Sequence, residues 1–90
     1  MATYSLCYKP SVEKDLLSIP HALASRLLDQ INRLPSDPFP SQSAKLHGAE
    51  RLYRLRVGDY RVIYEVDRAL AKITVHYIRH RRDVYRGLRR

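Results

Sequence analysis

The chain has 90 residues, of which 44% are hydrophobic and 29% are charged, and 17 basic against 9 acidic side chains give it a net charge of +8. This length allows one modest core, and the single cysteine excludes an internal disulfide. Because there is no long apolar run and no basic leader, we expect neither a membrane-spanning helix nor a secretory signal. We therefore expect a single domain over residues 1–90, located in the cytoplasm.

The first third of the chain predicts one strand followed by two helices. Residues 3–8 alternate as in a short strand, and Pro10 ends it. Apolar residues at helical spacing predict a helix over 11–19, with Ser11 as its N-cap. A second, clearly amphipathic helix is predicted over 20–34. Its apolar stripe consists of Leu23, Leu27, Ile31 and Leu34.

The rest of the chain predicts a sheet. Three prolines indicate a loop over 35–43, and alternating residues then predict strands over 51–57, 60–66 and 71–78. The two residues 58–59 form the turn between the first two of these strands. Helices followed by consecutive strands predict an α+β fold, in which two N-terminal helices pack on an antiparallel sheet of about four strands.

Alternation assigns the side chains of these strands to two faces. A two-residue turn at 58–59 pairs Arg56 directly with Arg61, and it places Arg54 on the same polar face. Glu65 is the only acidic residue that we expect beside these arginines. The predicted core face consists of Tyr53, Leu55, Val57, Tyr60, Val62, Tyr64, Val66, Ile73, Val75 and Tyr77.

Basic residues concentrate in the second half of the chain, where residues 46–90 contain eleven arginines and one lysine against five acidic residues. The planar arginine fork matches the geometry of phosphate oxygens. Like charges directly opposite each other, as at Arg56 and Arg61, cost about 0.2 to 1 kcal/mol unless an anion lies between them. The pattern favours nucleic acid as the partner over an acidic protein or an anionic membrane. The alternative interpretation is a basic face and tail that only keep the protein soluble.

Metal chemistry is not indicated. His21 and His47 have no partner residue at the spacing of metal ligands, and no group of carboxylates accompanies the arginines. We therefore expect no metal and no other cofactor.

Three motifs in a fixed order resemble a known family. They are KLHG at 45–48, YRLRVGDYRVIY at 53–64 and IRHRRDVY at 78–85. Together with the N-terminal strand and helices they are similar to the RelE branch of the RelE/ParE toxin superfamily, over essentially the whole chain. The resemblance implies two helices packed on an antiparallel sheet and a toxin that cuts mRNA in the ribosomal A site. It also implies three partners: the ribosome, mRNA, and a cognate antitoxin, which wraps the toxin. No membrane is involved.

The resemblance assigns roles to individual residues. Arg54 and Arg56 correspond to a basic pair that lines the scissile phosphate, and Arg61 corresponds to an arginine that stabilises charge at that phosphate. Arg81 corresponds to an arginine that protonates or stabilises the leaving 5′ oxygen. Tyr85 corresponds to a tyrosine that stacks on the nucleotide or orients it.

The sequence departs from the RelE pattern at two points. The basic pair is often lysine in RelE, and arginine practically cannot act as a base. The spacing to Tyr85 is also shorter than in the best-known member, which leaves His80 open as an alternative acid to Arg81. Because guanidinium groups can stabilise the charge that develops when RNA is cleaved by its own 2′-hydroxyl, we expect a metal-independent endoribonuclease. The alternatives are a ParE-like gyrase inhibitor without nuclease activity and an inactive module that binds RNA or the ribosome.

Overall fold

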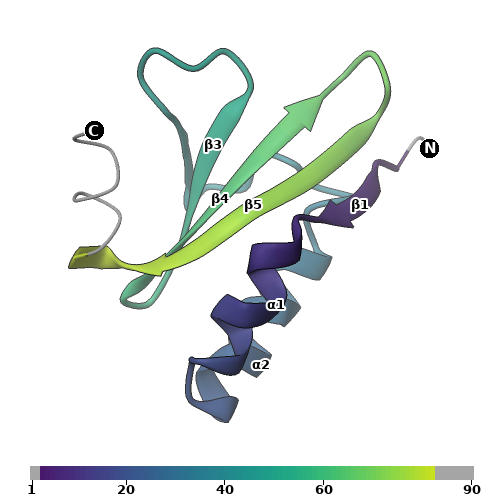
Figure 1. Ribbon diagram of the computed structural model, residues 1–90. Coiled ribbons are helices and arrows are strands. Elements are labelled where there is room, and N and C mark those ends of the chain that lie inside the picture. Colours follow the sequence, from purple (N-terminus) through teal and green to yellow (C-terminus); the bar gives the residue numbers. More distant parts are fainter. Residues whose placement is uncertain (1–2, 83–90) are drawn as a thin grey trace.

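The computed structural model describes residues 3–82, which form two helices and five strands (Figure 1). In chain order these are β1 (Ser5–Tyr8), α1 (Pro10–Leu17), α2 (His21–Asn32), β2 (Ser43–Lys45), β3 (Leu52–Val57), β4 (Tyr60–Asp67) and β5 (Lys72–His80). The predicted α+β fold, with two N-terminal helices packed on a sheet, is confirmed. The predicted site residue Tyr85 lies outside the described residues.

The sheet has the strand order β1-β5-β4-β3-β2, one strand more than the sequence predicted. The additional strand is β2, at the end of the predicted loop, where three residues pair antiparallel with β3. The sheet is also mixed, because β1 pairs parallel with β5 while the other neighbours are antiparallel. β4 pairs with one edge of β5, the last strand of the meander. β1 pairs with the first part of the other, outer edge of β5.

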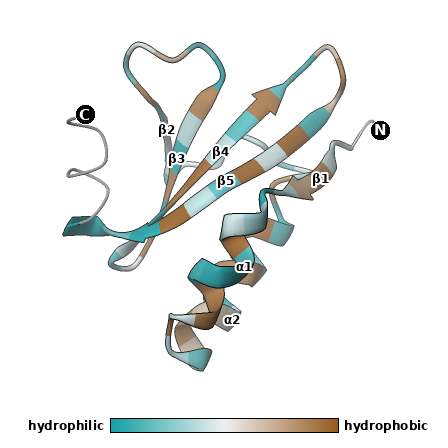
Figure 2. Cartoon of the chain, viewed as in Figure 1, coloured by the Kyte–Doolittle hydropathy of each residue, from teal (hydrophilic) through white to brown (hydrophobic). Residues whose placement is uncertain are grey.

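Helices α1 and α2 lie side by side and cover one face of the sheet (Figure 1). Hydrophobic and hydrophilic residues alternate along the central strands (Figure 2), as a sheet covered on one face requires. No helix among residues 3–82 is long and apolar enough to cross a membrane. The core between helices and sheet consists of Val12, Ile19, Leu27, Ile31, Leu34, Leu55, Val57, Val62, Tyr64, Val66, Ile73, Val75 and Ile78.

Side chains of α1 complete the outer edge of β5 where β1 has ended. The Ser11 hydroxyl donates to the carbonyl of His76 at 3.1 Å, and the Asp15 carboxylate accepts the backbone N–H of Ile78 at 2.9 Å. The prediction that Ser11 caps the helix is therefore wrong, because the helix begins one residue earlier, at Pro10. Proline suits this first position because it has no N–H to leave unsatisfied.

An irregularity in β5 changes the predicted faces of that strand. Ile63 of β4 pairs with Tyr77, but the next residue of β4 pairs with Val75, so His76 is an extra residue in β5. Such a bulge reverses the alternation of side chains beyond it. The prediction that Tyr77 lies in the core is therefore wrong: Tyr77 lies on the face away from the helices, and Ile78 is buried in the core instead.

Candidate nucleic-acid interface

Three arginines lie in one row across the sheet, on the face away from the helices. The register pairs Arg56 of β3 with Arg61 of β4, as predicted, and Arg61 with Arg79 of β5. Neighbouring strands are about 4.8 Å apart, so the three backbone positions span only about 10 Å. Arg79 was missed because the strand was predicted to end at residue 78 and the rest was taken as a tail. We call Arg56, Arg61 and Arg79 the arginine row.

Arg61 differs from its expected position on an open, polar face, because it is only 7% exposed. Its Nη1 atom donates to the carbonyl oxygens of Gly58 at 3.1 Å and Tyr60 at 3.0 Å. Gly58 lies in the turn between β3 and β4, and Tyr60 is the first residue of β4. The guanidinium is therefore held at this turn, and its charge acts through a medium of lower dielectric constant than bulk water.

Arg81 reaches the same turn from the end of β5. Its backbone N–H donates to the carbonyl of Asp59 at 2.7 Å, and its Nη1 atom lies 4.0 Å from the Asp59 carboxylate. The Arg81 side chain is 61% exposed, so a ligand can approach it. Arg61 and Arg81, which are 20 residues apart in sequence, thus both contact the β3–β4 turn.

His80 lies on the other side of the sheet from this convergence. It pairs with Tyr60, and the two rings meet edge to face with centroids 5.5 Å apart. Tyr60 packs against the core under the helices, and His80 borders a hollow that it shares with Asp15 of α1. The structure therefore places the Arg81 side chain beside the β3–β4 turn, whereas the His80 ring packs on the ring of Tyr60, whose carbonyl is one of the two contacts of Arg61.

Arg79 is bound to a carboxylate at the outer end of the arginine row. Its Nη1 atom lies 2.8 Å from Oδ2 of Asp15, and its Cζ atom lies 4.9 Å from the centroid of the Tyr77 ring. The Asp15 carboxylate offsets one of the three positive charges, which reduces the repulsion within the row. The stacked guanidinium in turn orients Tyr77 on the same face.

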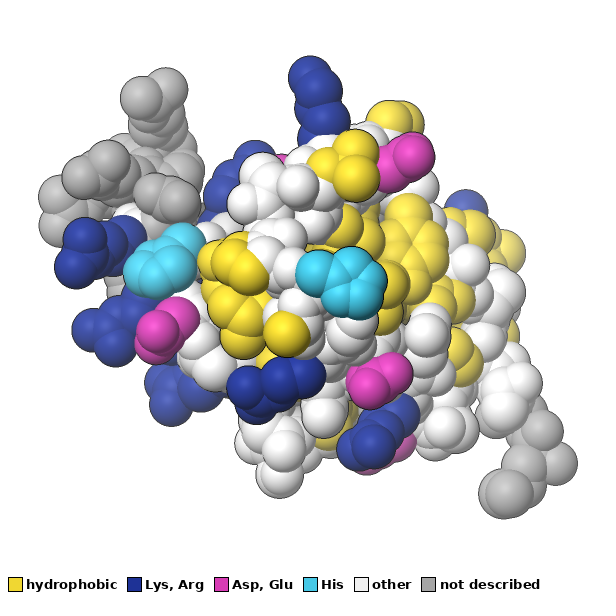
Figure 3. All heavy atoms as spheres, turned by 90° about the horizontal axis from the view of Figure 1, so that it is seen from below, with side chains coloured by type: hydrophobic (Ala, Val, Ile, Leu, Met, Phe, Trp, Pro, Cys, Tyr) yellow, Lys and Arg dark blue, Asp and Glu magenta, His cyan; other side chains and the backbone are white. Residues whose placement is uncertain are grey.

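Several basic side chains gather on the left side of the molecule when it is seen from below (Figure 3). A histidine and an acidic side chain lie among them in this view. Among residues 3–82 there is no group of three or more His, Cys, Asp or Glu side chains that could hold a metal ion. The chemistry that these basic groups offer is the binding of anions and the stabilisation of negative charge.

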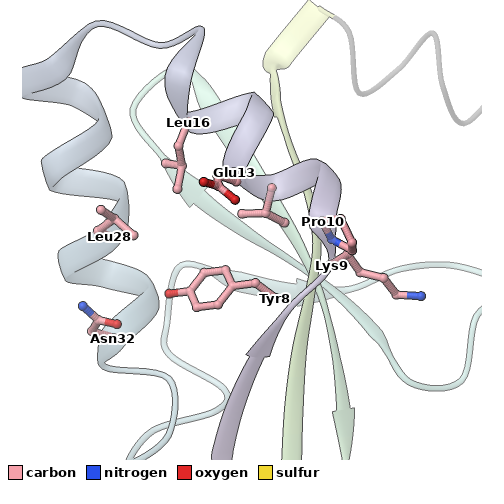
Figure 4. Close-up of a pocket in the computed structure, with 8 residues that line it drawn as sticks. Tyr8, Lys9, Pro10, Glu13, Leu16, Leu28 and Asn32 are labelled. Atoms are coloured by element: carbon pink, nitrogen blue, oxygen red, sulfur yellow. The ribbon is translucent and has the colours of Figure 1, made fainter.

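A hollow of about 470 Å³ lies elsewhere, between the two helices (Figure 4). The ring of Tyr8 points across it towards Leu28 and Asn32 of α2, and Leu16 of α1 closes another side. It shares no residue with the arginine row. This hollow is therefore separate from the candidate nucleic-acid interface.

The comparison with known proteins agrees with this architecture. No curated protein sequence matches the chain. The family model for the ParE toxin of type II toxin–antitoxin systems, parDE, matches residues 6–85. The chain belongs to the RelE/ParE toxin superfamily. The membership expected from the three sequence motifs is thereby confirmed.

Solved structures place this toxin near RelE. It is 36% identical to a chain of the archaeal RelE–RelB complex from Pyrococcus horikoshii, with a TM-score of 0.79 over 88% of this toxin and 96% of that chain. A chain of the RelB–RelE complex from Methanococcus jannaschii is 24% identical, with a TM-score of 0.75 over 90% and 96%. The isolated RelE toxin of E. coli is 19% identical, with a TM-score of 0.74 over 94% of each chain. The fold is thus RelE-like, and the 36% identity to the Pyrococcus horikoshii chain extends the similarity to the sequence.

Proposed function

We propose that this toxin is a ribosome-dependent endoribonuclease that cleaves mRNA in the A site of the 30S subunit and thereby inhibits translation in the cytoplasm. The observation that carries the proposal is the convergence of Arg61 and Arg81 on the β3–β4 turn, next to Arg56. The similarity to chains of RelE–RelB complexes supports a cognate antitoxin as the partner that silences the toxin.

The proposed reaction needs no metal and no other cofactor. The 2′-hydroxyl of the RNA attacks the adjacent phosphorus and loses its proton to water, the bond to the 5′ oxygen breaks, and that oxygen takes up a proton. The products are a 2′,3′-cyclic phosphate and a 5′-hydroxyl. Arg54, Arg56 and Arg61 stabilise the negative charge on the phosphate oxygens during this step. Arg81 stabilises the leaving 5′ oxygen, either by a hydrogen bond or by passing it a proton that water replaces at once, and Tyr85 orients the nucleotide.

This proposal assigns no strong base to the toxin, because an arginine stays protonated. The attacking hydroxyl must therefore be activated chiefly by its in-line geometry, and correct positioning alone can contribute several kcal/mol to catalysis. A requirement for the ribosome follows, since the ribosome would hold the mRNA in that geometry.

The test is cleavage of a defined mRNA on programmed ribosomes by purified toxin. We expect cleavage in the A-site codon and a loss of at least tenfold in rate for Arg56→Ala, whose side chain is exposed. The matched control is Arg26→Ala, an exposed arginine on α2, which should cleave at the wild-type rate. Intact mRNA with the wild-type toxin, or equal rates for the two variants, would contradict the proposal.

A ParE-like gyrase inhibitor is the second candidate, because the matching family model is described as the ParE toxin of parDE. A DNA supercoiling assay with purified gyrase separates the two functions. Inhibition of supercoiling without mRNA cleavage would identify the toxin as a gyrase inhibitor. Ribosome binding with neither activity would indicate an inactive ribosome-binding module.

A further inference from the structure

A cavity of about 500 Å³ opens on the same face of the sheet as the arginine row. Arg54 and Leu52 of β3 line it, together with Tyr77 of β5. Lys45, Leu46 and His47, from the end of β2 and the segment that follows it, form the rest of its wall. Its volume lies within the range of cavities that bind small molecules.

The cavity adjoins the arginine row directly. The register aligns Ala44, Arg54, Ile63 and Tyr77 in one line across four strands. This line lies two residues along the strands from the arginine row, a distance of about 7 Å. A ligand in the cavity would therefore be a close neighbour of a phosphate held at the arginine row.

The Tyr77 ring is held in place before any ligand binds. The Arg79 guanidinium lies over it, with 4.9 Å between Cζ and the ring centroid, and Asp15 holds that guanidinium at 2.8 Å. The bulge at His76 is what places Tyr77 on this face. An aromatic ring that is already oriented loses less conformational entropy on binding than a mobile one.

The side chains of the cavity combine two kinds of chemistry. Tyr77, Leu46 and Leu52 offer an aromatic ring and apolar surface, which suit the flat face of a base. Arg54 offers positive charge, which suits a phosphate. An acidic peptide would use only this cation and would leave the ring and the leucines without a matching group.

We propose that this cavity binds one unstacked nucleotide of the RNA substrate, adjacent to the phosphate that is cleaved. Its base lies against Tyr77 and the leucines, and its phosphate lies against Arg54. This inference rests on the proposed nuclease function and names a site for single-stranded RNA within it. Only an unpaired nucleotide can present a base in this way, since paired bases remain stacked inside a helix.

The test uses the purified toxin without ribosomes. The backbone amide signals are followed by NMR during titration with adenosine 5′-monophosphate and, separately, with ribose 5-phosphate, which has the phosphate but no base. We expect shifts at residues 44–54 and 77, and an affinity at least fivefold higher for the nucleotide. Tyr77→Ala should abolish that difference, and Tyr77→Phe should keep it. Arg54→Ala should weaken the binding of both probes.

Lys72→Ala is the matched control, because Lys72 is exposed on the same strand as Tyr77 and does not line the cavity. Equal affinities for the two probes, or a preference that persists in Tyr77→Ala, would overturn the nucleotide site. Shifts of the same amides produced equally by a polyglutamate peptide would assign the cavity to an acidic protein and also overturn it. Because these readouts need no ribosome, they are independent of the cleavage assay that tests the nuclease function.

Discussion

Arg61 has a structural role, and the proposed function assigns it a chemical role as well. It is 7% exposed and donates to two carbonyl oxygens of the β3–β4 turn. We predict that Arg61→Ala lowers the free energy of unfolding by about 1 to 3 kcal/mol, because charge-assisted hydrogen bonds are lost. It should also abolish mRNA cleavage. Urea unfolding and ribosome cleavage are measured together, with exposed Arg56→Ala as the variant that should lose cleavage alone. An unchanged urea midpoint for Arg61→Ala would contradict the structural task.

The identity of the acid can be read from the pH dependence of cleavage. Arg81 contacts the turn that also holds Arg61, whereas His80 lies against Tyr60 on the helix-covered side. We predict that single-turnover cleavage on programmed ribosomes shows no falling limb between about pH 6 and 8.5, because arginine keeps its proton while a histidine acid would lose it. Arg81→Ala should lower the rate at least tenfold, and His80→Ala should leave it within a few-fold. A neutral-pH limb that disappears in His80→Ala would give the role to His80.

At the scale of elements, one carboxylate connects α1 to the last strand. Asp15 accepts the backbone N–H of buried Ile78 at 2.9 Å and binds Arg79 at 2.8 Å. We predict that Asp15→Ala lowers the free energy of unfolding by about 1 to 3 kcal/mol, because a buried N–H loses its acceptor. Glu13→Ala, an exposed acidic residue on the same helix, should cost less than about 1 kcal/mol. Thermal unfolding of the two variants checks this, and equal losses would refute the connection.

A second connection joins β4 to the loop before β2. The Tyr64 hydroxyl donates to the carbonyl of Pro38 at 2.7 Å, and burial raises the pKa of Tyr64 from 10.0 to about 12. The folded state therefore keeps this proton more tightly than the unfolded state does. The contribution of the protonated Tyr64 hydroxyl to the free energy of unfolding is complete below pH 10 and is lost as the pH rises towards 12. We predict that the unfolding free energy of the wild type falls more steeply between pH 10 and 12 than that of Tyr64→Phe. Parallel curves for the two proteins would contradict this.

At the scale of the whole molecule, the net charge of +8 shapes the encounter with an antitoxin. Most of this charge lies in the second half of the chain, in which residues 52–80 contain β3 to β5. We predict that the antitoxin covers the face with Arg54, Arg56 and Arg61 or displaces the segment around Tyr85. Its affinity should then fall as salt rises, because exposed charges are screened within about 8 Å at 0.15 M salt. Calorimetry with the cognate antitoxin at several salt concentrations measures this. An affinity independent of salt would contradict this and would mean that the antitoxin binds the helices instead.

Much of this fold follows from local sequence patterns. The alternation of Leu55, Val57 and Val62 around the Gly58 turn is sufficient to predict the pairing of Arg56 with Arg61, because side chains alternate strictly and a two-residue turn fixes the register. The amphipathic second helix was predicted from its apolar stripe in the same way. Strand β2 was not, because three residues after a proline-rich loop carry no periodicity of their own and pair only because β3 offers an open edge.

The site depended more on tertiary structure. The sequence by itself determined that Arg54, Arg56 and Arg61 share a face and, through three motifs, the toxin superfamily. Only the tertiary structure decided the rest. The bulge at His76 places Tyr77 on the same face as the arginine row, and hydrogen bonds to the turn carbonyls hold Arg61 in a buried position. It also brought Arg81 to the contacts of Arg61 and placed His80 on the opposite side. The physical reason is that a bulge and hydrogen bonds between distant segments depend on residues far apart in the chain, which periodicity along one strand cannot report.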